Sequence, residues 1–299
     1  EAYNNLGITI QKPEECIKYL KKAIAINPIY AGAYNNLGIA LKNTGRLEES
    51  EFIIRKAIKL NPNFTGAYNN LGLILTELGR LEEAEEFLQK AINLKDNFPE
   101  AHNNLGIVYQ EIKKLADAKK SFKKAIDLQP NFTEAKNNLG NVLKDLEMHD
   151  EAEQYFREVI ALRPDFAEAY NNLGILLQDK DHIEESITMY CKAINLKPNF
   201  IDSFKNLANS LKGFTFKKPN KNLQKIIRDI LKQKTLVRPQ DILTAVISLL
   251  KFEKNLIYAF EKKTRDELTY FIDETIIKLS KLPLLLEVMS ICPISDFDL

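Results

Sequence analysis

The sequence repeats the tetrapeptide Asn-Asn-Leu-Gly at an almost constant interval. The copies end at Gly7, Gly38, Gly72, Gly106, Gly140 and Gly174, and a seventh, altered copy ends at Ala208. The first interval is 31 residues and every later one is 34. A constant period near 34 residues is typical of stacked helix–turn–helix units, because such a unit cannot bury its apolar face without its neighbours. The chain is therefore expected to form an array rather than a single globular core.

Three further residue types recur in phase with the glycine. An aromatic residue stands eight positions before it at Tyr30, Phe64, Phe98, Phe132, Phe166 and Phe200. A small residue stands twelve positions after it at Ser50, Ala84, Ala118, Ala152 and Ser186, and a proline stands twenty-four after it at Pro62, Pro130, Pro164 and Pro198. Small residues let helix axes approach closely, and proline ends a helix. Each period therefore predicts two helices, the second of which ends before the proline.

This pattern resembles the tetratricopeptide repeat (TPR) family. One unit meets the family pattern at Tyr68, Leu71, Gly72, Leu75, Ala84, Leu88 and Ala91. The resemblance covers roughly residues 1–213 and implies an all-α, right-handed superhelical solenoid of six full helix–turn–helix units plus a partial seventh. Two departures are expected to weaken packing locally: the first unit is three residues short before Pro13, and Lys136 occupies an aromatic slot.

The repeat register ends at Gly213. Residues 214–299 keep helical apolar stripes but lose the repeat positions. We therefore expect two regions, a TPR array at 1–213 and a helical cap or connector at 214–299 that covers the last unit. The chain enters its first helix at Glu1 and stops at Leu299 without a polar tail, so we expect a fragment of something larger.

Composition limits the partners. The net charge is +1, so no nucleic-acid partner is expected, and the longest apolar stretches, 242–250 and 282–289, are too short to cross a membrane. Cys16, Cys191 and Cys292 lie far apart, which indicates packing thiols in a reducing compartment, and a cytoplasmic location is expected. No metal-ligand spacing, phosphate loop or nucleophile motif occurs. We expect no catalytic residue, metal, cofactor or small-molecule substrate, and hence no enzyme within this fragment.

Helix packing does not explain the repeated Asn-Asn pair, because Asn is unfavourable in the interior of a helix. In the family that the chain resembles, the residue before Leu-Gly faces the concave groove. The resemblance therefore implies a row of groove residues at Asn5, Asn36, Asn70, Asn104, Asn138, Asn172 and Asn206. A carboxamide donates and accepts at once, so it can bind the backbone of an extended peptide. The alternative is that these side chains bond between neighbouring helices. For the first Asn of each pair, both alternatives stay open.

Acidic residues form a possible second element of this groove, at Glu100, Glu134, Glu168 and Asp202. If they face it, a ligand with Lys, Arg or hydroxyl side chains is favoured. They also lie where the helix macrodipole favours an acid, which is the simpler explanation.

The sequence thus predicts a protein–protein interaction scaffold that binds extended peptide or protein segments in an Asn-lined groove. The alternative is the substrate-recruiting arm of a larger transferase, because the array resembles most closely the repeat arms of O-linked N-acetylglucosamine transferase-like proteins. The stretches 282–289 and 293–299 also look similar to connectors ahead of bacterial glycosyl-, methyl- or sulfotransferase domains, which would lie beyond Leu299.

Overall fold

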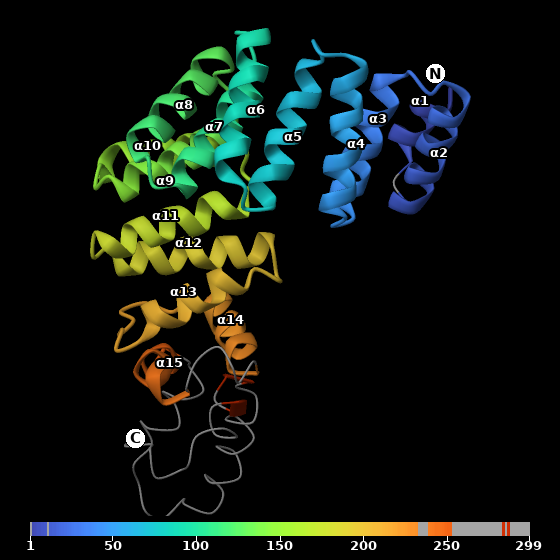
Figure 1. Cartoon of the computed structure of the whole chain (residues 1–299). Coiled ribbons are helices and arrows are strands. Elements are labelled where there is room, and N and C mark those ends of the chain that lie inside the picture. The colour runs from blue at the N-terminus through green and yellow to red at the C-terminus, as the bar shows by residue number, and fades with distance from the viewer. Residues whose placement is uncertain (1, 11, 233–238, 253–282, 285, 288–299) are drawn as a thin grey trace, which may run out of the picture. The chain divides into compact units, whose positions relative to one another are not determined.

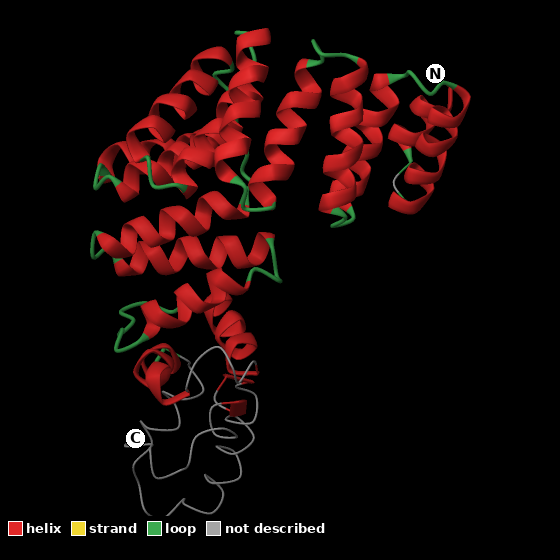
Figure 2. Cartoon of the chain, viewed as in Figure 1, coloured by secondary structure: helices red, strands yellow, loops and turns green. Residues whose placement is uncertain are grey.

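The computed structural model describes the chain except for residues 1, 11, 233–238, 253–282, 285 and 288–299 (Figure 1). Within the described residues the secondary structure is entirely helical, with no strand (Figure 2). The stretch 293–299, Cys292 and half of the stretch 282–289 lie outside the described residues. The all-helical fold class is confirmed.

The helices form antiparallel pairs, one pair for each sequence period. The first helices are α1 (Ala2–Thr9), α3 (Ala31–Asn43), α5 (Thr65–Glu77), α7 (Pro99–Glu111), α9 (Thr133–Asp145), α11 (Ala167–Asp179) and α13 (Ile201–Leu211). The second helices are α2 (Pro13–Ile26), α4 (Leu47–Leu60), α6 (Leu81–Leu94), α8 (Leu115–Leu128), α10 (His149–Leu162) and α12 (Ile183–Leu196). After these come α14 (Lys221–Lys232), the 3-10 helix η1 (Pro239–Ile242) and α15 (Leu243–Leu250).

The chain forms two compact units, Glu1–Glu158 and Val159–Leu299. Their boundary falls inside α10 and therefore does not coincide with residue 213, where the repeat register ends. In the second unit, α14 and α15 share one apolar core with α12 and α13, formed by Tyr190, Leu207, Ile227 and Leu249 among others. The described part of 214–299 thus packs against the last repeat helices, while the division at residue 213 stays a prediction.

Each repeated glycine lies against a large side chain of the second helix of its pair. A Cβ atom added to Gly72 would lie 2.5 Å from Leu88 Cγ, and one added to Gly106 would lie 2.6 Å from Phe122 Cε1. Gly140 and Gly174 have the same relation to Phe156 and Tyr190, both at 2.6 Å. These large side chains are fully buried, so they have little room to move away. The glycine is required because a large residue of the second helix occupies the place of its side chain.

We therefore expect Gly106→Ala to destabilise the fold by about 1–3 kcal/mol through overpacking against Phe122. The matched control is Gly66→Ala, also on a first helix, where the added Cβ would be 3.5 Å from its nearest atom. There the loss of glycine flexibility should leave stability unchanged or raise it by about 0.5–1 kcal/mol. Urea unfolding of both variants measures the difference, and equal stabilities would contradict the glycine contact.

The turn inside each of the second to sixth units contains one residue in the left-handed region. In the early units this residue is a glycine, Gly45 with φ 77° and Gly79 with φ 75°. In the next three units the same position holds Lys113, Glu147 and Asp181, with φ between 60° and 62°. Residues other than glycine are sterically strained in this region, because their Cβ atom crowds the backbone. The repeat therefore keeps the turn geometry even where the sequence does not favour it.

Glu147→Gly is accordingly expected to raise the free energy of unfolding by about 1 kcal/mol, because it removes the left-handed strain. The reciprocal change, Gly79→Ala, should lower it by a similar amount, since its added Cβ meets nothing within 4 Å and strain is the only effect. Thermal unfolding monitored by circular dichroism tests both. A loss of stability in Glu147→Gly would show that the Glu147 side chain makes a contact that outweighs the strain.

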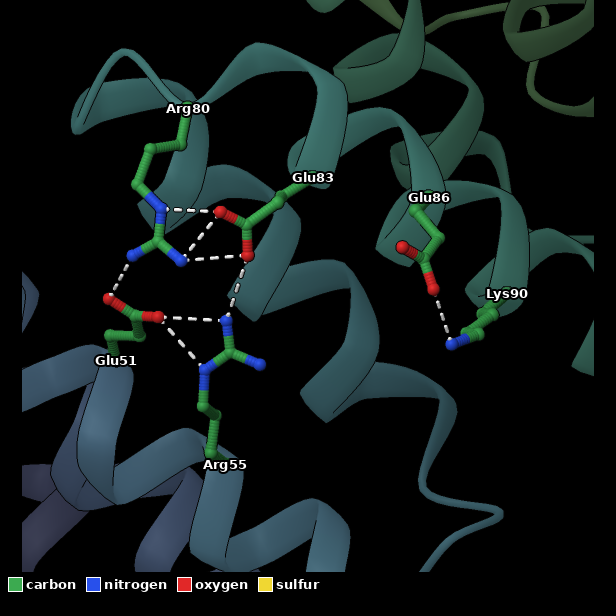
Figure 3. Close-up of polar contacts among 6 residues, drawn as sticks. All are labelled: Glu51, Arg55, Arg80, Glu83, Glu86 and Lys90. Carbon is green, nitrogen blue, oxygen red and sulfur yellow. Dashed lines mark hydrogen bonds and ion pairs between the residues drawn. The ribbon is translucent and has the colours of Figure 1, made fainter.

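Ion pairs connect α4 to α6 on the surface of the first compact unit (Figure 3). Arg55 bonds Glu51 at 2.8 Å and Glu83 at 3.3 Å, and Arg80 bonds the same two carboxylates at 2.8 and 2.7 Å. The four charges alternate in a closed ring. The hydrogen bond from Arg80 holds the pKa of the Glu83 carboxyl below its usual value. Three of the four side chains are 40–44% exposed, so each pair contributes little stability by itself, and the ring joins two neighbouring units.

Candidate functional site: the asparagine ladder

The first Asn of each pair is buried. Asn4, Asn35, Asn69, Asn103, Asn137 and Asn171 are only 5–8% exposed. From Asn35 onward, each lies between a buried alanine and a buried leucine of its helix, for example Asn103 between Ala101 and Leu105. A buried carboxamide needs hydrogen-bond partners, because leaving it unpaired costs about 1–3 kcal/mol.

The second Asn of the next unit supplies that partner. In the first compact unit, Nδ2 of Asn36 donates to Asn4 Oδ1 at 2.9 Å and Nδ2 of Asn70 donates to Asn35 Oδ1 at 2.8 Å. Nδ2 of Asn104 donates to Asn69 Oδ1 at 2.9 Å, and Nδ2 of Asn138 donates to Asn103 Oδ1 at 3.1 Å. In the second compact unit, Asn206 bonds Asn171 in the same way at 3.1 Å. We call these bonds between successive units the asparagine ladder.

The ladder settles what the first Asn does. The choice left open by the sequence, groove contact or contact between helices, is resolved in favour of the contact between helices for Asn35, Asn69, Asn103 and Asn171. For the second Asn, the alternative of an interhelix bond is observed at Nδ2. These side chains are still half-buried rather than enclosed, and Asn5 is exposed. Interhelix bonding therefore does not remove them from the surface.

The second Asn belongs to one accessible stripe on each first helix. On α7 this stripe is Glu100, Asn104, Ile107 and Glu111, and on α9 it is Glu134, Asn138, Asn141 and Asp145. Spacings of four, three and four residues place these side chains on one side of a helix. In both helices the outer two are exposed and the middle two half-buried, whereas the intervening alanine, leucine and glycine positions are buried. We call this repeated surface the ladder face.

The acids predicted from the sequence lie at the beginning of this stripe. Glu100, Glu134 and Asp202 are exposed, and Glu134 accepts a hydrogen bond from Thr133 Oγ1 at 3.0 Å. Glu168 is half-buried and pairs with Lys197 Nζ at 2.7 Å. Partial burial raises the pKa of the Glu168 carboxyl, but the hydrogen bonds from Lys197 and the backbone, together with the charges of Lys197 and Arg163, bring it below its usual value. The structure thus places these residues beside the ladder, with Glu168 in an ion pair.

A second acidic row was missed by the sequence analysis. Glu77, Glu111, Asp145 and Asp179 close the same stripes at the last residue of α5, α7, α9 and α11, and all are exposed. A helix C-terminus is the negative end of the macrodipole, so an acid there is unfavourable for the helix. Glu77 is compensated by Lys42 at 2.9 Å, across to the preceding first helix. The 34-residue interval between these four acids was the signal that could have found them.

We expect the ladder bond to contribute measurable, coupled stability. Asn69→Ala and Asn104→Ala should each lower the free energy of unfolding by about 0.5–1.5 kcal/mol, because each removes one partner of the same bond. The double variant should lose clearly less than the sum of the two, and a double-mutant cycle by urea unfolding measures that coupling. Strict additivity would show that Asn104 and Asn69 do not stabilise each other.

The described residues contain neither a cluster of metal-ligating side chains nor a membrane-spanning helix. No group of three or more His, Cys, Asp and Glu side chains there is placed to hold a metal ion. No helix in the described ranges has the length and apolar character needed to cross a membrane. Cys16 and Cys191 are both free thiols, and burial raises the pKa of Cys191 to about 12.

Comparison with known proteins identifies the repeat. Five family models described as TPR or tetratricopeptide repeats match residues 31–64, 53–86, 72–113, 99–132 and 132–199. Together they cover the chain without a gap from 31 to 199, which is more than half of its 299 residues. No curated protein matches the sequence.

Solved structures of the same fold have low sequence identity to this chain. A chain of the APC/C hetero-tetramer Cut9-Hcn1 is 21% identical with a TM-score of 0.65, over 70% of this chain and 42% of that one. Pseudomonas aeruginosa pilF is 23% identical with a TM-score of 0.60, over 70% of this chain and 96% of that one. The TPR protein TTC0263 of Thermus thermophilus is 22% identical with a TM-score of 0.54, over 60% and 98%. This chain thus spans less than half of the Cut9-Hcn1 chain, and at these identities the likeness concerns the fold alone. The comparisons give no support to the finer resemblance to transferase arms or connectors.

Proposed function

Because the chain belongs to the tetratricopeptide repeat proteins, whose repeats typically mediate protein–protein interaction, we propose that it binds an extended peptide segment along the ladder face. One observation carries this proposal: successive first helices present a half-buried Asn side chain at the same position. In each stripe, an acid or glycine precedes this Asn by four residues and an apolar or amide residue follows it by three. A peptide in an extended conformation can contact equivalent side chains on successive units. Many weak contacts along the array then add to a useful affinity.

The ladder bond supports this role instead of competing with it. A carboxamide nitrogen carries two hydrogens and its oxygen has two lone pairs, and the bond to the preceding unit uses one hydrogen. The oxygens of Asn36 and Asn104 receive only long contacts, of 3.4 and 3.5 Å, from the neighbouring Asn35 and Asn103. The ladder therefore fixes the orientation of the carboxamide while leaving capacity for a peptide N–H and C=O. Side chains ordered before binding lose less entropy when the ligand arrives.

The two acidic rows indicate the charge of the ligand. Acids stand at both ends of the stripe on α7 and on α9, so a segment bound along these two helices passes between carboxylates on either side. Lys and Arg side chains extending to both sides of a strand would meet them. The exposed acids at helix C-termini are unfavourable for the helices themselves, which supports a role in binding. We therefore include basic side chains in the proposed ligand, and exclude phosphate chains.

Two triple variants test the groove separately from the ladder. Asn70, Asn104 and Asn138 changed together to Ala remove three ladder bonds and three accessible carboxamides. Asn35, Asn69 and Asn103 changed together to Ala remove the same three bonds but keep the accessible carboxamides. At about 0.5–1.5 kcal/mol for each contact, the first variant should bind roughly tenfold to a thousandfold more weakly, and the second much less so.

The assay is fluorescence anisotropy with a library of extended peptides that carry Lys and Arg, with acidic and uncharged libraries as controls. Both triple variants are first checked for folding by circular dichroism. Basic peptides should bind best and lose affinity as salt is raised. Equal losses in the two variants would assign the asparagines to stacking alone, and no preference for basic peptides would remove the charge argument.

Two finer expectations remain proposals. A location in the cytoplasm is proposed because Cys16 and Cys191 are free thiols, which suits a reducing compartment. The role of a recruiting arm for a transferase is compatible with peptide binding by these repeats but has no observation of its own in its favour.

A further inference from the structure

The first helix pair differs from the others by the loss of one helical turn. α1 ends at Thr9, two residues after Gly7, whereas α3, α5, α7, α9 and α11 each end five residues after their repeated glycine. α2 begins at Pro13, three residues earlier than the 34-residue register of the glycines would place it. Three residues correspond to about 4.5 Å of helix. The last turn of α3 therefore lacks the cover that a full-length preceding helix would give it.

Two residues show this missing cover. Ala40 on α3 is 7% exposed, while the residues at the same position of the later first helices, Ile74, Val108, Val142 and Leu176, are all fully buried at 0%. Cys16 on α2 is half-buried, while its counterparts Ser50, Ala84, Ala118, Ala152 and Ser186 are also at 0%. In addition Ala40 is smaller than any of its four counterparts. A short neighbouring helix and a small side chain thus leave space at the same place.

That space is an open pocket of about 260 Å³. It is lined by Ile10, Pro13, Cys16, Asn36, Ile39, Ala40 and Asn43. Asn36 is also a member of the asparagine ladder, through its bond to Asn4. Asn36, Ile39 and Asn43 form the ladder-face stripe of α3, so the pocket opens directly beside the surface assigned to the peptide.

We propose that this pocket receives one large apolar side chain, of phenylalanine or leucine size, from the extended peptide bound along the ladder face. This inference rests on the proposed function and adds an anchor residue to it. The volume suits such an occupant, since an apolar cavity of about 150 Å³ already accepts benzene. An anchor in a pocket at one end also fixes the position of the ligand, which a row of equivalent carboxamides cannot do.

The lining favours an apolar occupant over a charged one. Five of the seven lining residues present carbon or a thiol, and none is acidic or basic. Burial raises the pKa of the Cys16 thiol, which keeps it uncharged near neutral pH. The two asparagines lie beside apolar residues, and Nδ2 of Asn36 already donates one hydrogen bond to Asn4. A Lys or Glu side chain would lose hydration here and meet no opposite charge among the lining residues.

Disulfide exchange onto Cys16 tests the pocket without any peptide. The protein, with Cys292 replaced by Ser, is equilibrated with phenethyl disulfide or with cystamine in the presence of a competing thiol. Mass mapping then measures how much Cys16 is modified by each probe. Wild-type Cys16 should prefer the phenethyl group by about tenfold, which corresponds to roughly 1.4 kcal/mol of apolar burial.

The matched variants are Ala40→Ile, which places the side chain found at Ile74 into the pocket, and Ala40→Ser, which keeps the space open. Ala40→Ile should abolish the tenfold preference while leaving thermal stability unchanged or higher, and Ala40→Ser should keep the preference. No preference in the wild type, or the same preference in Ala40→Ile, would overturn the pocket assignment whatever the peptide results are.

A second measurement links the pocket to the ladder. Basic peptides with a single Phe should bind the wild type about tenfold more tightly than the same peptides with Ala, and Ala40→Ile should remove this difference. If both peptides bind equally well while the Asn70, Asn104 and Asn138 variant still loses binding, the proposed function stands and the anchor is wrong. If no peptide binds, the proposed function fails and the anchor fails with it.

Discussion

The contact between a glycine of the first helix and a large residue of the second sets the geometry of every complete repeat. Phe122 and Phe156 occupy the places that side chains at Gly106 and Gly140 would need. This close approach keeps the two helices of a pair in a constant relation. Each first helix therefore presents its Asn pair to the next unit in the same way, and the ladder bonds recur at 2.8 to 3.1 Å. The accessible stripe, the acidic rows and the proposed binding surface all depend on that repetition.

The asparagine ladder combines a structural and a functional role in one side-chain type. A leucine at the buried position would pack without needing a partner, and glutamate or lysine at the accessible position would favour the helix more than asparagine does. The pair is explained when the buried Asn holds the accessible one in place and the accessible one retains hydrogen-bonding capacity. This also explains why the two interpretations of the sequence, interhelix bond and groove contact, are compatible.

Departures from the repeat have different structural consequences. Lys136 in the aromatic slot was expected to weaken packing, yet its ammonium pairs with Glu158, its side chain is only 12% exposed and it lies near the Tyr155 ring. Glu147 keeps the turn geometry of Gly79 under strain. The short α1, by contrast, leaves an open pocket between Cys16 and Ala40 among the described residues. A change of side chain is accommodated locally, but a lost turn of helix removes a surface that only another element could replace.

The sequence by itself determined the all-helical fold and its division into helix pairs, because both follow from residue types that recur at a fixed period. It also located the asparagines that matter. Only the tertiary structure decided which Asn is buried, that Asn104 bonds Asn69 rather than a residue of its own unit, and that Ala40 and Cys16 border a pocket. These facts concern contacts between residues about 24 to 35 positions apart, and their geometry depends on how two units stack. A period in the sequence predicts that units repeat, but the distance between two side chains on neighbouring units follows only from their packing.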